Sequence, residues 1–157
     1  MSYRLSNRSI GKLDTVHDDL QVVVRLAIQH TTQDFSVIEG IRSIARQRKL
    51  FDRGASKTMR SRHITGHAVD LAPWLDGGIR WDWPLFYPIA AAMRSAALDC
   101  GVLIRWGGVW DTPLNKLPED AKGIHSAVDS YVDRRRNAGK RAFIDGPHFE
   151  LHKENYP

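Results

Sequence analysis

The chain has 157 residues, 42% of them hydrophobic and 26% charged, with a formal net charge of +5. This size and balance indicate one globular domain and argue against a disordered chain, and no apolar run reaches the roughly 18 residues of a membrane-spanning helix. The single cysteine, Cys100, excludes an internal disulfide and a cysteine-rich zinc site. The basic charge favours anionic partners, and the N-terminus lacks the apolar segment of a secretory signal.

The first third of the chain contains three predicted elements. Apolar residues recur at steps of three and four from about Ile10 to Gln29, which predicts an amphipathic helix. The short β-rich run from Asp34 to Glu39 predicts a strand. Ser43 to Arg53 predicts a second helix, which Gly54 would end.

The middle of the chain alternates strands and a helix. The alternation from Gly66 to Ala72 predicts a buried strand, and Pro73 is expected to end it. Pro84 to Asp99 predicts a second long helix with a proline in its first turn. A short strand is predicted from Val102 to Arg105.

The last third is less regular. Trp106 to Trp110 is an aromatic, glycine-rich turn, Thr112 to Ala142 shows little periodicity, and His148 to Leu151 predicts a final strand. Helices therefore come first, and short strands are then mixed with helices. This order favours an α+β fold over a doubly wound one, in a single catalytic domain over residues 1–157.

Two clusters, residues 61–70 and 145–152, combine histidine with carboxylates. Zinc accepts this ligand set where cysteine is absent, and a catalytic zinc needs three protein ligands. His63 and His67 have the spacing of a helical zinc pair, but the neighbouring glycine and strand pattern argue against a helix there. His63 with Asp70 is the other pairing, and spacing alone leaves this choice open.

The first cluster follows the pattern Ser-x-His-x-x-Gly-x-Ala-x-Asp, from Ser61 to Asp70. This pattern resembles the signature of the D-alanyl-D-alanine carboxypeptidase family of zinc peptidases, and Asp145-x-x-His148 matches that family's second motif. Further matches occur in the family's order: Gly40-Ile41-Arg42, Gln47 and Leu50 before Gly54 and Ser56, and Trp106-Gly107-Gly108-x-Trp110. Together these motifs span about residues 35 to 151.

Within that family the chain most resembles the phage endolysins that act as L-alanyl-D-glutamate peptidases. The resemblance implies a small antiparallel sheet with helices packed on it and one zinc ion per chain at the sheet. It implies the zinc ligands His63, Asp70 and His148. It also implies Asp145 as general base and Arg42 as a group that stabilises charge on the reacting carbonyl.

Other residues receive roles by the same resemblance. Ser61, Gln47 and Trp110 are candidates for substrate binding, and residues 112–142 are expected to be a family-specific insertion. The roles of His67, Glu150 and His152 stay open. A ligand set of two histidines and an aspartate also accepts divalent metals other than zinc.

The expected activity is hydrolysis of the L-Ala–D-Glu bond in peptidoglycan stem peptides, leading to lysis of a bacterial host. The alternatives are a D-Ala-D-Ala carboxypeptidase or dipeptidase, and a zinc-containing binding module without catalysis. We expect a monomer that reaches the periplasm and cell wall from the host cytoplasm at lysis, with anionic envelope polymers as possible further partners. Nucleic acid is not expected, because no recognition motif accompanies the basic charge.

Overall fold

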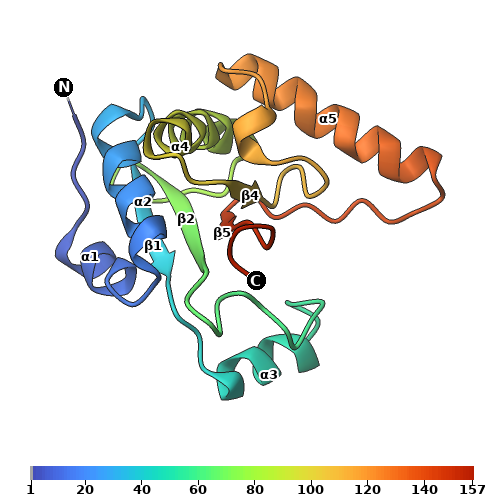
Figure 1. The fold of residues 1–157 in the computed structure, drawn as a ribbon, viewed down its shortest axis with the longest axis horizontal. Coiled ribbons are helices and arrows are strands. Elements are labelled where there is room, and N and C mark those ends of the chain that lie inside the picture. Colours follow the sequence, from blue (N-terminus) through green and yellow to red (C-terminus); the bar gives the residue numbers. More distant parts are fainter. Residues whose placement is uncertain (1) are drawn as a thin grey trace.

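In the computed structural model, which describes residues 2–157, five α-helices surround a small antiparallel sheet (Figure 1). The strand order is β1-β2-β5-β4, and β3 pairs with the end of β2. The strands are β1 (Phe35–Glu39), β2 (Ala68–Leu75), β3 (Gly78–Ile79), β4 (Ile104–Trp106) and β5 (His148–Leu151). The helices are α1 (Asn7–Leu13), α2 (Asp18–His30), α3 (Ile44–Asp52), α4 (Phe86–Cys100) and α5 (Ala121–Asn137). The predicted α+β class is confirmed.

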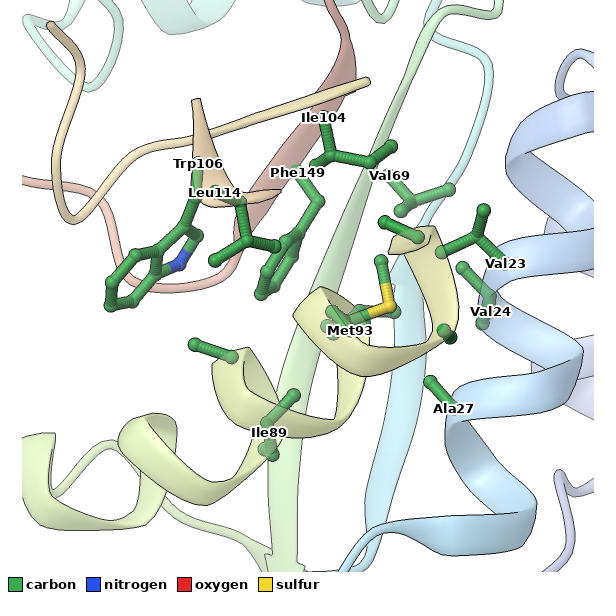
Figure 2. Close-up of a cluster of buried hydrophobic side chains, with 14 of the residues drawn as sticks. Val23, Val24, Ala27, Val69, Ile89, Met93, Ile104, Trp106, Leu114 and Phe149 are labelled. Atoms are coloured by element: carbon green, nitrogen blue, oxygen red, sulfur yellow. The ribbon is translucent and has the colours of Figure 1, made fainter. Parts of the chain in front are cut away.

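One face of the sheet packs on helices and carries the hydrophobic core. Strand side chains alternate between faces, so Val69, Phe149 and Ile104 all point toward α2 and α4 and are fully buried. Figure 2 shows these side chains meeting Met93 of α4 and Val24 of α2 in one cluster. Because this face is filled by apolar side chains, polar groups of the same strands must lie on the other face.

The other face of the sheet is polar at its centre. Asp70 alternates with Val69 on β2, and His148 and Glu150 alternate with Phe149 on β5. These three polar residues therefore leave the sheet on the side away from α2 and α4. The alternation that builds the core thus also gathers the ionisable side chains of two strands.

The first predicted helix is divided in the structure. The expected span Ile10 to Gln29 is two helices, α1 and α2, because the chain turns between them at Asp14 to His17. Thr15 Oγ1 donates to the Lys12 carbonyl, and His17 Nδ1 accepts from the Asp19 N–H and so caps α2. Local side-chain bonds of this kind compete with helix continuation, and hydrophobic periodicity does not reveal them.

The prediction that Pro73 ends its strand is wrong, since β2 continues to Leu75. Beside Pro73, the Trp74 N–H donates to the carbonyl of Asp34, the residue just before β1, at 2.9 Å. Proline lacks an N–H, but the ladder to β1 does not use that of Pro73. The strands β1, β4 and β5 and the helices α3 and α4 lie within two residues of their expected ranges.

Residues 112–142 contain α5, the longest helix of the described chain. That this segment is a family-specific insertion stays a prediction. The buried residues Ile124, Val128 and Tyr131 of α5 follow a helical spacing, and the Asp120 carboxylate accepts from the Gly123 N–H at the start of the helix. A long return segment then leads from α5 back to β5 (Figure 1). Among residues 2–157, no helix combines the length and the apolarity needed to cross a bilayer.

Candidate metal centre

Three predicted ligands converge on the polar face of the sheet. Asp70 lies directly opposite His148 in the β2–β5 ladder, and His63 comes from the turn that precedes β2. Asp70 Oδ1 lies 3.1 Å from His63 Nε2 and 3.5 Å from His148 Nδ1. One ligand atom from each of the three residues lies within 4.8 Å of the others, so the group could hold a metal ion.

The outer nitrogen of each histidine is anchored. His63 Nδ1 lies 2.9 Å from the Gly40 carbonyl oxygen, and His148 Nε2 lies 2.8 Å from Glu150 Oε1. Both partners are acceptors, so these nitrogens carry protons and the inner nitrogens face Asp70. Metal-binding histidines usually show this arrangement, in which an outer acceptor fixes the tautomer and the ring orientation. The donor set and its anchors therefore fit zinc.

Protonation of the metal-free site follows from the same contacts. Burial alone would raise the pKa of Asp70, but hydrogen bonds to His148 and His63 lower it below its ordinary value. Burial disfavours charge on His148 as well, yet hydrogen bonds to Asp70 and Glu150 raise the pKa of His148 to about 9. At neutral pH the metal-free site thus holds a proton on His148 that a metal ion must displace.

The choice that spacing left open concerns His67, which points away from this group. Its Nδ1 lies 2.6 Å from Thr65 Oγ1, and its ring stacks on that of His17 at 5.8 Å. Gly66, just before it, has a φ of 74°, a left-handed conformation that ends the turn after His63. The structure brings Asp70, rather than His67, next to His63.

Asp145 lines a cavity together with His63, Asp70 and His148, and the glycine-rich turn after β4 holds its backbone. Its backbone N–H donates to the Gly107 carbonyl at 2.8 Å. A Cβ on Gly107 would clash with the Asp145 carbonyl, so only glycine allows this approach. Burial, and the negative charge of Asp70, raise the pKa of Asp145 above its ordinary value. A carboxylate with a raised pKa is a better proton acceptor than an exposed aspartate.

Arg42 reaches the site from the segment after β1 and is clamped by Glu39. The two guanidinium donors Nε and Nη2 bond the two Glu39 carboxylate oxygens at 2.8 and 2.7 Å. Nη2 also lies 3.6 Å from Asp70 Oδ2. A register shift between Val37 and Glu39 brings Glu39 opposite Asp70 in the β1–β2 ladder, and bulges of this kind re-aim side chains at functional sites.

Gln47, expected to bind substrate, lies behind Arg42 and is fully buried. Its Oε1 accepts from Arg42 Nη1 at 2.8 Å, and its Nε2 donates to Ser56 Oγ and to the Thr58 carbonyl. The side chain is not among those that line the cavity. Every polar atom of Gln47 is used inside the protein, where the residue supports Arg42, and its expected contact with substrate stays a prediction.

The candidate metal-binding group opens into a cavity of about 570 Å³. Ser61 and Trp110 line this cavity, and their contact with substrate stays a prediction. Ser61 Oγ accepts from the His63 N–H at 3.2 Å and lies 3.5 Å from Arg42 Nη1. Trp110 stacks on Phe143 with 6.4 Å between ring centroids, and it contacts the ring of His148 at 5.3 Å.

The structure assigns contacts at the site to two carboxylates, Glu150 and Glu39, whose roles the sequence left open or did not address. Glu150 anchors His148, and its other oxygen lies 3.8 Å from Arg62 Nε and 4.0 Å from Arg105 Nη1. Glu39 clamps Arg42. The signal for Glu150 was its two-residue offset from His148 on one strand, which places both on the same face. Glu39 had no such signal, because the bulge that redirects it leaves no pattern in the sequence.

Comparison with known proteins agrees with this geometry. Residues 1–129 match the family model described as phage L-alanyl-D-glutamate peptidase. The chain belongs to this family. It is 34% identical over 155 residues to the L-alanyl-D-glutamate peptidase of Escherichia phage T5, covering 96% of this chain and 99% of that protein. The crystal structure of the Serratia marcescens L-Ala D-Glu endopeptidase ChiX superposes with a TM-score of 0.74 at 38% identity, covering 98% of this chain and 94% of that one.

Proposed function

We propose that this protein is a zinc-dependent endopeptidase that hydrolyses the L-Ala–D-Glu bond of peptidoglycan stem peptides and so lyses a bacterial host. The observation that carries the proposal is the convergence of His63, Asp70 and His148, with both outer histidine nitrogens anchored, beside the carboxylate of Asp145. Membership of the L-alanyl-D-glutamate peptidase family supports the choice of bond.

His63, Asp70 and His148 would supply the three protein ligands that a catalytic zinc site uses, and such a site keeps its fourth position for water or substrate. Zinc bound there would polarise the scissile carbonyl and lower the pKa of water toward about 7. Asp145 would take a proton from the attacking water and pass it to the leaving amine. The buried setting and raised pKa of Asp145 suit this exchange, because the group must hold a proton briefly and then release it.

Arg42 would stabilise the negative charge that develops on the carbonyl oxygen. Glu39 and Gln47 fix its guanidinium, while the Nη1 and Nη2 atoms also face Ser61 and Asp70 in the cavity. A donor already fixed before the reaction needs no reorganisation, and loss of one such donor typically costs about 2.7–4 kcal/mol of transition-state stabilisation. Ser61, which contacts both residues, would keep His63 and Arg42 in position relative to each other.

The deciding experiment uses defined muropeptides with mass spectrometry of the products. We expect cleavage between L-Ala and D-Glu, loss of activity after chelation, and recovery when zinc is added back. Release of D-Ala without cleavage at D-Glu would instead identify a D-Ala-D-Ala carboxypeptidase. Zinc binding with no product from any muropeptide would identify a binding module.

A further inference from the structure

A second hollow of about 650 Å³ runs beside the metal-site cavity, along α5 and the return segment to β5. Its lining carries five cationic side chains and one carboxylate, Asp111. We call this hollow the α5 groove. Its cationic lining residues are Lys57, Arg105, Arg134, Arg135 and Lys140. Such a density of positive charge in one concave surface favours an anionic ligand.

The α5 groove adjoins the metal-site cavity. Trp110, Phe143, Arg105 and Lys57 line both hollows. The stacked rings of Trp110 and Phe143 form the shared wall, and the Arg105 guanidinium lies 4.9 Å above the Trp110 ring. A chain bound across the metal site can therefore extend past this wall into the α5 groove.

The cations of the α5 groove differ in how far the protein already neutralises them. Asp111 holds Arg134 through two hydrogen bonds of 2.9 and 3.1 Å. By contrast, Lys57 and Lys140 are exposed, and their ammonium groups form no hydrogen bond or ion pair within the described residues 2–157. These two ammonium groups of the groove lining are free to meet a ligand.

Resting on the proposed function, we infer that the α5 groove is a specificity subsite for the carboxylate-bearing peptide segment on the D-Glu side of the scissile bond. A glutamyl residue has two carboxyl groups, and only one can form the peptide bond to the next residue. The other stays free, and the segment ends in a further carboxylate. The side of the substrate that follows the cleaved bond is thus acidic, whereas the L-Ala side carries no charged side chain.

The shape of the α5 groove separates this ligand from an anionic membrane surface. Lysine and arginine side chains that bind a lipid surface need only an exposed face. Here the cations line a hollow together with the aromatic residues Trp110, Tyr131 and Phe143, and this hollow adjoins the proposed catalytic cavity. An extended peptide fits both features, since its backbone can lie on the aromatic rings while its carboxylates meet Lys57 and Lys140.

The test compares two soluble peptides that share an L-Ala–D-Glu bond, one with free carboxylates on the D-Glu side and one with those carboxylates amidated. We expect wild-type kcat/KM to be about tenfold higher for the free acid, as two exposed charge pairs would give. The double variant Lys57→Glu/Lys140→Glu should lose this preference, so that the ratio of its kcat/KM values for the free-acid and amidated peptides falls from about ten to about one or below. The matched control Lys49→Glu/Lys122→Glu changes the same charge outside the groove and should keep the preference.

The outcomes distinguish this inference from the proposed function. If the wild type cleaves both peptides at equal rates, or if the groove variant keeps the preference, the subsite is wrong while the endopeptidase assignment stands. If the wild type cleaves neither peptide, the proposed function fails and the subsite with it. A groove variant that keeps the preference but loses binding to vesicles of anionic phospholipid would overturn the subsite and assign the groove to a membrane surface.

Discussion

His148 Nε2 lies 2.8 Å from Glu150 Oε1, and the two side chains leave β5 on the same face of the sheet. Glu150 therefore sets both the tautomer and the orientation of His148. Burial would raise the pKa of Glu150, but its bond to His148 keeps that pKa below the ordinary value. The carboxylate is thus charged at neutral pH and makes the imidazole more basic.

Substitution Glu150→Gln should weaken zinc binding about 10- to 100-fold, the usual cost of removing such a partner of a metal-binding histidine. The amide keeps the size of the carboxylate but removes the charge that supports His148. Competition with a chromophoric chelator measures the affinity. Glu154→Gln, at an exposed residue of the same C-terminal segment, is the matched control, and equal affinities of the two variants would contradict the role of Glu150.

Zinc uptake should release a proton at neutral pH, because the pKa of His148 in the metal-free protein is about 9. Apparent zinc affinity should then rise with pH up to about 9 and level off above it. Calorimetry in buffers of different ionisation enthalpy counts the released protons. Absence of proton release at pH 7 would show that His148 is already neutral.

The same pKa shift has a consequence for stability with a defined sign. A histidine whose folded pKa is raised from 6.5 to about 9 stabilises the metal-free protein fully below pH 6.5, and this contribution is lost as pH rises through 9. Thermal denaturation of the metal-free protein should therefore show a Tm that falls over this interval. In Glu150→Gln the fall should be smaller and end at a lower pH, since one of the two acceptors that raise the folded-state pKa is weakened.

The sequence predicted which residues meet at the candidate metal centre better than it predicted the residues that support them. His63, Asp70 and His148 follow a spaced pattern of residue types that can be seen without coordinates. Gln47 belonged to the same pattern, but its burial behind Arg42 depends on how α3 packs, which spacing does not encode. The pattern therefore reported that Gln47 matters to the site without reporting what it touches.

The fold likewise combines features that local sequence patterns predict with features that depend on distant contacts. Alternation from Gly66 to Ala72 predicted a buried strand, because it depends only on neighbouring residues. Besides its local bonds, the break between α1 and α2 has distant partners: the Ile41 N–H donates to Thr15 Oγ1, and the His17 N–H donates to the Gly66 carbonyl. These bonds attach the helix break to the two segments that present Arg42 and His63, and no local pattern contains them.

Substitution Asp145→Asn should separate catalysis from stability. Loss of the base should lower kcat about 10²- to 10⁴-fold while zinc stoichiometry stays at one per chain. Because the pKa of Asp145 is raised, its charged form destabilises the fold at neutral pH, and the neutral amide should leave Tm of the metal-free protein unchanged or higher. Asp133→Asn, at an exposed residue of α5, is the control and should change neither quantity. Undiminished lysis of permeabilised cells by Asp145→Asn would refute the base role.

Substitution Gly107→Ala should damage the site without replacing a ligand or the base. The new methyl group would clash with the Asp145 backbone carbonyl, so the turn after β4 and the segment carrying Asp145 would have to separate. Overpacking of this kind typically costs about 1–3 kcal/mol of stability, and we expect kcat to fall because Asp145 moves relative to His148. Gly78→Ala, where a Cβ meets no atom within 4 Å, should be neutral. Denaturant unfolding and muropeptide kinetics of the two variants measure both effects, and equal kcat in the two would show that the position of Asp145 does not depend on this turn.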